Sequence, residues 1–253
     1  MKIQYASDLH LEFRDNTRYL HDNPLIPVGD VLVLAGDIGY FDDVSYSTHP
    51  FWDWAADNFK QTLVIPGNHE FYKSGDLGTI QSGCIAEIRP NVKCYHNTVV
   101  TIENVDFILS TLWANIPIEN AFITEKNVSD FYRIAYNGRL LTAHLFNQAH
   151  QEAVAFLQKS IAAGTTHKRV VVTHHVPSVL CMSDEFKTSR INGAFVSELH
   201  DFIFDSPIDY WIYGHSHRNI DTMIGNTQCV SNQLGYVSHN EHISFNTKKI
   251  IEV

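Results

Sequence analysis

Two histidines separated by one residue, His215 and His217, follow Gly214 near the C-terminal end of the 253-residue chain. The run before them, residues 209–213, is aromatic and β-branched, which is typical of a buried strand. Glycine permits a sharp backbone turn, and alternate residues of a strand project from the same side. We therefore expect both imidazoles to leave the strand end toward one point, where they could bind a metal ion.

The N-terminal segment contains a second pair of this kind. A short strand is predicted over residues 3–7, and Asp8 and His10 follow it. Alternation places a carboxylate and an imidazole on one side of the chain. The apolar run over residues 30–35 is typical of a strand covered on both faces, and it ends just before a second carboxylate, Asp37.

Two further predicted strands end in polar residues. Residues 62–65 are stopped by a Pro-Gly pair and lead to Asn68 and His69, and residues 169–173 run directly into His174. Strands that alternate with helical segments indicate βαβ units and a parallel sheet. Sites in such sheets form outside the carboxyl ends of the strands. The repetition therefore predicts one shared site.

The collected strand-end residues supply imidazole and hard oxygen donors without a thiolate: Asp8, His10, Asp37, Asn68, His69, His174, His215 and His217. This donor set suits Mn²⁺, Fe²⁺/Fe³⁺ or Zn²⁺. A single ion would not need so many protein ligands while keeping a position open for water. Two ions about 3.5–4 Å apart that share a carboxylate would use them all.

The elements that must position these side chains are predicted from apolar periodicity and turn residues. Helices are expected over residues 50–59, 76–89, 140–163 and 193–204, and further strands over 92–95, 98–102, 107–111, 227–231 and within 243–253. Residues 14–29 are expected to form a loop. The irregular stretch 113–137 is either a wall of the substrate site or a partly helical packing loop.

Composition limits the class of protein. The chain is 44% hydrophobic and 18% charged, so one globular α/β domain over residues 1–253 is expected. A formal net charge of −10 argues against extended nucleic-acid binding. Four scattered cysteines predict neither a zinc ribbon nor a disulfide scaffold. Without a signal-peptide pattern or a run of about 20 apolar residues, we expect a cytoplasmic protein that makes no membrane contact.

Five sequence blocks resemble, in order, the signatures of the calcineurin-like metallophosphoesterase superfamily: Asp8-x-His10, Gly36-Asp37, Gly67-Asn68-His69-Glu70, His174-His175 and Gly214-His215-x-His217. Five ordered blocks are far more specific than any one of them. The chain looks like a compact bacterial-type member. The resemblance implies a four-layer α/β/β/α sandwich with two mixed β-sheets and the metal ions at the strand ends.

The resemblance also implies a role for each residue of these blocks. One ion would be bound by Asp8, His10, Asp37 and His217, and the other by Asp37, Asn68, His174 and His215. A hydroxide bridging the two ions would attack phosphorus in line, and His69 would protonate the leaving oxygen. His175 would be a supporting or pocket residue.

The chain departs from the family pattern at two places. Many members carry an Asp where this chain has Tyr40, so the usual carboxylate partner of His69 is missing. The alternatives are that Asp42, Asp43 or Glu70 takes its place, or that His69 works without a carboxylate. Residues 232–236 lack an arginine that close relatives often have, which removes one anion contact. The arginine-rich signatures of the protein Ser/Thr phosphatases are also missing.

Substrate choice depends on charge, because a phosphodiester carries one negative charge and a phosphomonoester nearly two. Extra cations near the metals would favour the monoester, and the cationic candidates are Arg133, Lys187 and Arg190. We favour a small phosphodiester, for example of nucleotide type, with four candidate substrate contacts: His175, Arg133, Tyr132 and Asn115. A phosphomonoesterase acting on a small metabolite or phosphoprotein, and a non-catalytic scaffold, are the alternatives.

Overall fold

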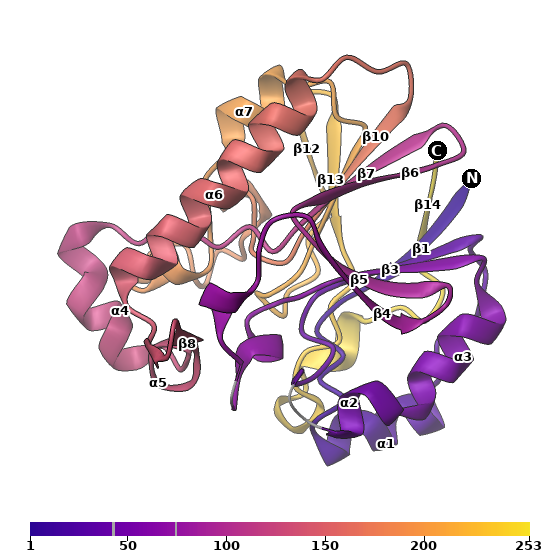
Figure 1. Cartoon of the computed structure of the whole chain (residues 1–253), viewed down its shortest axis with the longest axis horizontal. Coiled ribbons are helices and arrows are strands. Elements are labelled where there is room, and N and C mark those ends of the chain that lie inside the picture. Colours follow the sequence, from indigo (N-terminus) through magenta and orange to yellow (C-terminus); the bar gives the residue numbers. More distant parts are fainter. Residues whose placement is uncertain (42–43, 74) are drawn as a thin grey trace.

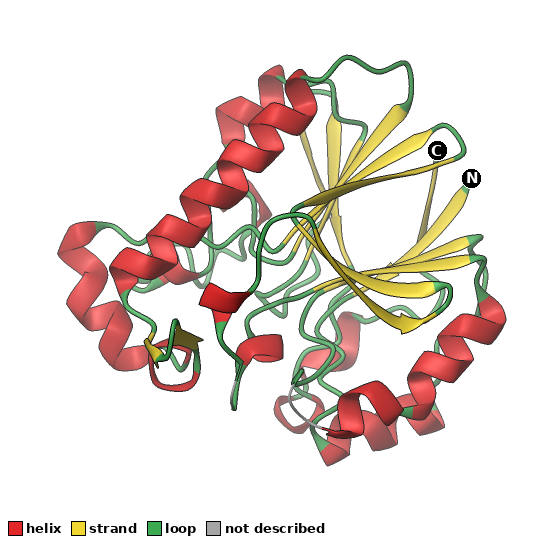
Figure 2. Ribbon diagram, in the orientation of Figure 1, coloured by secondary structure: helices red, strands yellow, loops and turns green. Residues whose placement is uncertain are grey.

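The computed structural model describes residues 1–41, 44–73 and 75–253, and two six-stranded sheets lie at its centre (Figures 1 and 2). The first sheet has the order β14 (Ile250–Glu252), β1 (Lys2–Ala6), β2 (Val31–Ala35), β3 (Gln61–Ile65), β5 (Val92–His96) and β4 (Cys84–Arg89). The second has the order β12 (Thr222–Ile224), β13 (Thr227–Ser231), β11 (Tyr210–Tyr213), β10 (Lys168–Thr173), β7 (Val105–Ser110) and β6 (Thr98–Ile102). A separate two-stranded ribbon pairs β8 (Ala135–Tyr136) with β9 (Arg139–Leu140).

Helices cover the outer face of each sheet (Figure 2). The first sheet is covered by α1 (Arg14–Asp22), α2 (Val44–Thr48) and α3 (Pro50–Asn58), and the second by α6 (Ala143–Ala162) and α7 (His200–Asp205). Two short helices, α4 (Ala121–Asn127) and α5 (Asp130–Arg133), lie near the start of α6 (Figure 1). Single 3₁₀ turns are formed by His69–Phe71, Leu77–Thr79, Ile118–Asn120, Val179–Cys181, Asn192–Ala194, Val237–His239 and Glu241–Ser244.

The sheets pack face to face through alternate apolar residues. In β2, Val33 and Ala35 face the second sheet, whereas Leu32 and Leu34 face the helices. All five residues of β2 are buried, which confirms the prediction of a strand covered on both faces. The four-layer α/β/β/α sandwich with two mixed sheets is thus confirmed.

Parallel strands bring the site loops to one edge. The strands β1, β2 and β3 run parallel in the first sheet, as do β7, β10, β11 and β13 in the second. Backbone hydrogen bonds tie the loops beyond these strands together. The N–H of Asp8 donates to Gly36 O (3.0 Å), and that of Gly214 donates to His174 O (2.9 Å). The loop after each strand is therefore held against its neighbour.

The predictions of a loop over residues 14–29 and of a helix over residues 76–89 are wrong. Residues 14–29 contain the helix α1, whose one fully buried residue is the polar Asn16, so the apolar periodicity of a helix is missing from the sequence. Residues 76–89 form a 3₁₀ turn and the strand β4 in place of a helix. The strand lies at the sheet edge with mostly exposed side chains, so its apolar residues do not mark a core-facing stripe.

Other predicted elements differ in extent. The expected helix over 193–204 is shortened to α7, and the closing strand within 243–253 is limited to β14. The stretch 113–137 contains α4 and α5, as the packing-loop alternative required. The long helix expected over 140–163 is confirmed as α6, capped by the hydroxyl of Thr142. Among the described residues, no helix is long and apolar enough to cross a bilayer.

Candidate active site

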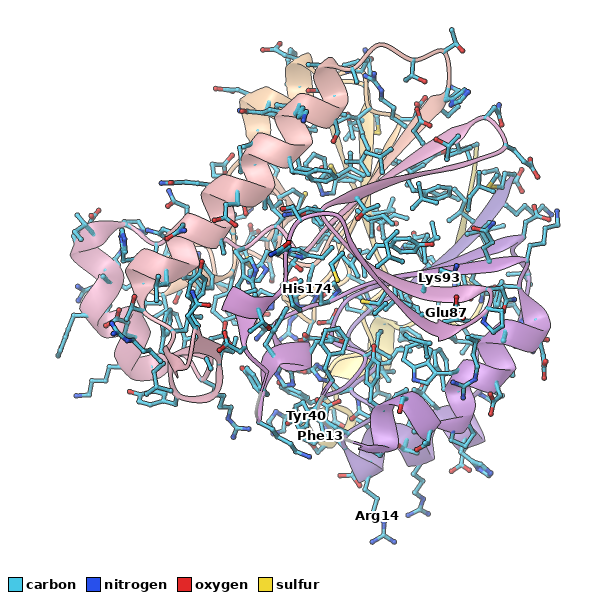
Figure 3. The ribbon with its side chains drawn as sticks, viewed as in Figure 1. Phe13, Arg14, Tyr40, Glu87, Lys93 and His174 are labelled. Atoms are coloured by element: carbon cyan, nitrogen blue, oxygen red, sulfur yellow. The ribbon has the colours of Figure 1, made fainter. Side chains whose placement is uncertain are left out.

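The side chains predicted as metal ligands meet where the two sheets present their carboxyl ends. Figure 3 shows His174 in the interior between the two halves, whereas Arg14 projects from the surface. Three groups of described side chains each keep their donor atoms within 4.8 Å of one another. One is formed by His10, Glu12 and His69, and the other two share Asp37. Of these two, the first group is Asp8, His10, Asp37 and His217, and the second is Asp37, His174 and His215.

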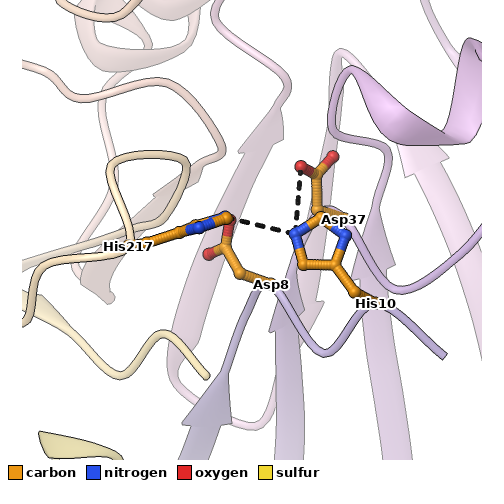
Figure 4. A group of neighbouring side chains, drawn as sticks. All are labelled: Asp8, His10, Asp37 and His217. Carbon is orange, nitrogen blue, oxygen red and sulfur yellow. Dashed lines mark hydrogen bonds and ion pairs between the residues drawn. The ribbon is translucent and has the colours of Figure 1, made fainter. Parts of the chain in front are cut away.

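The first group is drawn in Figure 4. His10 Nε2 lies 3.1 Å from His217 Nε2 and 3.8 Å from Asp37 Oδ2. His217 Nε2 is also 3.3 Å from Asp8 Oδ1. Asp8 and His10 follow β1, Asp37 follows β2 and His217 follows β11, so both sheets contribute.

The second group lies on the other side of Asp37. His174 Nε2 is 3.3 Å from Asp37 Oδ1 and 3.2 Å from His215 Nδ1. Asn68 joins this group, because its Oδ1 lies 3.1 Å from the same His174 nitrogen. The amide N–H of Asn68 donates to Asp130 Oδ1 (2.8 Å), which leaves its carbonyl oxygen directed at the group.

The ring nitrogens that point away from the two groups all have an acceptor. Carboxylates and carbonyls only accept hydrogen bonds, so the outer nitrogen carries the proton and the inner one presents a lone pair. Several lone pairs and two carboxylates directed at a shared centre fit divalent cations. The four outer pairs are His10 Nδ1 with Glu12 Oε1 (3.0 Å), His217 Nδ1 with Glu241 Oε2 (2.6 Å), His174 Nδ1 with Ala35 O (2.9 Å) and His215 Nε2 with Ala194 O (3.2 Å).

The electrostatics of the site also require positive charge. Burial alone would raise the pKa of the Asp37 carboxyl, but His174 and His69 hold it well below its usual value. Burial likewise disfavours the imidazolium of His217, yet Asp8 and Glu241 outweigh it and raise its pKa to about 10. Two buried carboxylates thus demand cations between them, and either protons on imidazoles or metal ions meet that demand.

The backbone is strained at five of these residues. Asp8, His10, Asp37, His215 and His217 have φ angles of 55°, 46°, 55°, 74° and 51°, in the left-handed region. Each such residue costs about 1–3 kcal/mol, so the surrounding packing must hold it in place. Positive φ re-aims each of these side chains out of the strand alternation, so that side chains from the three loops after β1, β2 and β11 reach one centre.

Gly214 has a different role from the one expected. The sharp turn with positive φ falls on His215 and His217, and Gly214 itself does not adopt a positive φ. Instead, a Cβ at Gly214 would lie 2.7 Å from Asp8 Oδ2. The glycine therefore makes room for the carboxylate of the opposite sheet.

His69 is held beside the first group by a residue that the sequence interpretation missed. Its Nδ1 lies 2.9 Å from Glu12 Oε1, and its Nε2 lies 3.2 Å from the hydroxyl of Tyr236. Asp37 and Glu12 raise the pKa of His69 although burial opposes this. Glu12 stands two residues after His10, in the turn that follows β1, and this closeness to the Asp8-x-His10 block was the signal for it.

The other candidate partners of His69 are used differently or fall outside the structure. Glu70 accepts hydrogen bonds from the backbone N–H groups of Asp37 (2.9 Å), Ile38 (2.7 Å) and Gly67 (2.7 Å), so it braces the loops. Tyr40 stacks on the His69 ring with the centroids 6.0 Å apart. Asp42 and Asp43 lie outside the described residues.

A cavity of about 370 Å³ opens onto both groups. Asp37, Asn68, His69, His215 and His217 line its floor. One side consists of residues 127–130, so the stretch 113–137 contributes to the wall as well as to packing. Another side is apolar and is formed by Met182, Phe186, Ile191 and Phe195.

The four residues predicted to contact substrate are absent from the described lining of this cavity. His175 is fully buried, and its ring centroid lies 4.2 Å from that of His215 and 5.2 Å from that of Trp113. Arg133 lies over the Tyr72 ring, the hydroxyl of Tyr132 donates to Lys126 O, and Asn115 is exposed. A substrate role for His175, Arg133, Tyr132 and Asn115 stays a prediction.

Known proteins resemble the chain over nearly all of its length. Calcineurin-like phosphoesterase is the family whose model matches residues 1–219. An uncharacterized protein of Acanthamoeba polyphaga mimivirus is 28% identical over 279 residues, covering 99% of this chain and 96% of that protein. The crystal structure of phosphopantetheinyl hydrolase from Mycobacterium tuberculosis superposes with a TM-score of 0.69 at 17% identity, covering 99% of this chain and 95% of that one. The chain therefore belongs to the calcineurin-like phosphoesterase family and is a phosphoester hydrolase.

Proposed function

We propose that this chain hydrolyses a small phosphodiester by in-line displacement at phosphorus. The observation that carries the choice of a diester is the charge of the cavity. Among its described lining residues, Arg218 is the only Lys or Arg. Its guanidinium lies over the Phe186 ring, and its Nε donates to Glu185 Oε1 (2.7 Å). A second negative charge on a phosphomonoester would find no uncommitted Lys or Arg among the described lining residues.

The other cationic candidates support the same choice. Arg133 packs over Tyr72, and Lys187 donates to Asp184 (2.7 Å) at the surface. Neither belongs to the described cavity lining. The carboxylate of Glu241 does, and it would repel a dianion further.

The shape of the cavity supports a small substrate with one apolar or planar arm. Its volume is at the lower end of the range for small-molecule sites. The side formed by Met182, Phe186, Ile191 and Phe195 suits a base or an alkyl group. A nucleotide-type diester has both a planar arm and a single charge on the scissile phosphate.

The chain belongs to a metal-dependent family, and its donor set suits Mn²⁺, Fe²⁺/Fe³⁺ or Zn²⁺. We propose that one ion is held by Asp8, His10, Asp37 and His217, and the other by Asp37, Asn68, His174 and His215. When bound, such a pair supplies Lewis acidity that activates water and stabilises charge on the phosphoryl oxygens. Within the chain, Glu12 and Glu241 orient the imidazoles of His10 and His217, and Asp130 orients the amide of Asn68.

His69 is the proposed general acid. Its Nε2 faces the cavity, and its pKa is raised by Asp37 and Glu12 against the effect of burial, which favours an imidazolium. As the bond from phosphorus to the leaving oxygen breaks, that oxygen keeps the electron pair of the bond and accepts the proton from His69 Nε2. The attacking water oxygen forms the new bond to phosphorus and releases one proton to solvent, from which His69 is reprotonated.

Parallel assays of the Mn²⁺-loaded enzyme test the diester proposal. We expect kcat/KM for bis-p-nitrophenyl phosphate to exceed that for p-nitrophenyl phosphate by about tenfold or more, equivalent to about 1.4 kcal/mol. The reverse order would assign a phosphomonoesterase. Because the structural neighbour is named for hydrolysis at a phosphopantetheinyl group, a small phosphodiester of that group is a useful third substrate.

A further inference from the structure

The carboxylate of Glu12 contacts two histidines that serve different purposes. Its side chain is only 3% exposed, and its Oε1 accepts from His10 Nδ1 (3.0 Å) and from His69 Nδ1 (2.9 Å). Its second oxygen has no hydrogen-bond partner among the described residues. Among the described residues, this buried carboxylate therefore accepts hydrogen bonds from the two imidazoles alone.

The rings around His69 fix its plane but leave its orientation open. Tyr72 stacks on the imidazole with the centroids 4.3 Å apart and an interplanar angle of 29°, and Tyr40 stacks at 6.0 Å and 24°. A flip of the ring by 180° would preserve both stacking contacts while placing Cδ2 where Nδ1 lies and Cε1 where Nε2 lies. The hydrogen-bond partners of the ring nitrogens distinguish the two orientations: the carboxylate of Glu12 at Nδ1 and the neutral hydroxyl of Tyr236 at Nε2. Glu12 lies at the Nδ1 edge, and the cavity lies at the other.

We propose that Glu12 is the positioning residue of His69: its carboxylate keeps a proton on Nδ1 and the Nε2 edge toward the cavity. It thereby does the work of the Asp that Tyr40 replaces. This inference rests on one part of the proposed function, namely that His69 protonates the leaving oxygen. After that transfer His69 is neutral with its remaining proton on Nδ1, which is the tautomer that an accepting carboxylate stabilises.

The same geometry makes Glu12 a link between metal binding and proton transfer. His10 presents its Nε2 to His217 and Asp37, so one carboxylate oxygen orients a predicted metal ligand and the predicted acid together. Any test of Glu12 must therefore separate its effect through His10 from its effect through His69. The leaving group provides that separation, because p-nitrophenolate departs without a proton and phenolate needs one.

The test compares Glu12→Gln with the wild-type enzyme on p-nitrophenyl methyl phosphate and phenyl methyl phosphate at saturating Mn²⁺. Glutamine has the same shape, but its amide is uncharged and can present N–H in place of an oxygen. We expect kcat for the phenyl ester to fall about 10- to 100-fold with KM unchanged, and kcat for the p-nitrophenyl ester to stay within about threefold of wild type. An equal fall on both esters, or no fall on either, would show that Glu12 does not act through His69 and would overturn the proposal.

Glu241→Gln is the matched control. Glu241 holds His217 Nδ1 as Glu12 holds His10 Nδ1, but no described contact joins it to the His69 ring. We expect this variant to lose bound metal, measured by elemental analysis, and to lose the two activities in equal proportion. Excess Mn²⁺ should restore both. If Glu241→Gln instead shows the leaving-group selectivity expected of Glu12→Gln, the proposal fails.

A double variant gives a readout that a purely structural role would not give. With His69→Gln in place, adding Glu12→Gln should cause no further loss on the phenyl ester, because residues that act as one unit are not additive. A further fall in kcat on the phenyl ester of tenfold or more in a folded, metal-saturated double variant would overturn the proposal. Circular dichroism and metal content confirm that each variant is folded and loaded.

The proposed function can fail separately. If the wild-type enzyme prefers phosphomonoesters, the diester assignment is wrong, and the same variants are compared on p-nitrophenyl phosphate and phenyl phosphate. Leaving-group selectivity in Glu12→Gln would then still support Glu12 as the positioning residue, and its absence would reject it.

Discussion

His215 and His217 stand two residues apart, yet they belong to different groups. His215 Nδ1 lies 3.2 Å from His174 Nε2, whereas His217 Nε2 lies beside Asp8 and His10. Positive φ at both residues turns the two rings toward different sides of Asp37. One short loop therefore contributes a ring to each of the two groups, and so to each of the two proposed ions.

This arrangement predicts separable metal loss. His215→Ala should weaken the site that contains His174, and His217→Ala the site that contains His10, so each variant should retain about one ion of two after dialysis. Elemental analysis measures the stoichiometry, with His21→Ala as the control because the His21 side chain is 86% exposed. Two ions retained in either site variant would contradict the assignment.

His69 is predicted to serve proton transfer and not metal binding. His69→Ala should keep both ions and lower kcat for phenyl methyl phosphate by about 10²- to 10⁴-fold, the usual contribution of a general acid. Steady-state kinetics combined with metal analysis of the same sample checks both parts. An unchanged kcat would remove His69 from the mechanism, and a lost ion would make it a ligand.

Glu12 shows what sequence patterns leave out at this scale. It lies in the turn after β1, two residues beyond His10, but its role depends on His69, which follows β3. That contact joins residues 57 positions apart and appears only once the sheet is assembled. The ligand types and their strand ends were readable because each block follows its own strand directly. The residues that hydrogen-bond to the side chains of these blocks, such as Glu12, could not be read from the sequence.

The elements around the site differ in how far the sequence revealed them. The strands β2 and β10 are continuous apolar runs and the helix α6 carries apolar residues at the helical period, so they were predicted. The helix α1 was missed because it docks through Asn16, whose amide donates to Leu9 O (3.0 Å) and Gly235 O (2.8 Å). A polar side chain that binds two backbone carbonyls leaves no periodic apolar signal.

The helix α6 is predicted to stabilise the wall of the site through Phe146. This side chain is fully buried and packs on Trp113 (ring centroids 5.3 Å apart) and Phe131 (5.9 Å). Phe146→Ala should lower the free energy of unfolding by about 3–5 kcal/mol, because it removes a packed ring and leaves a cavity. Urea unfolding measures the change. Phe122→Ala on α4, where the ring is 79% exposed, is the control and should change it by about 0.5 kcal/mol or less.

Across the whole molecule, the site joins the two sheets. Asp8, His10, Asp37 and Asn68 follow strands of the first sheet, and His174, His215 and His217 follow strands of the second. Each proposed ion would therefore be held from both sheets. Because neither coordination set survives when the sheets separate, ion binding and the packing of the sandwich are thermodynamically linked.

That linkage predicts that metal removal lowers thermal stability. At a free Mn²⁺ concentration about 100 times Kd, one site stabilises the fold by about 2.7 kcal/mol, which raises Tm by roughly 5–10 °C in a domain of this size. Differential scanning fluorimetry after EDTA treatment and after Mn²⁺ addition measures the shift. His21→Ala should keep the full shift and His217→Ala should lose a large part of it, because only His217 belongs to a coordination set that spans both sheets. A Tm that is the same with EDTA and with Mn²⁺, Fe²⁺ or Zn²⁺ would show that the site does not tie the sheets together through metal ions.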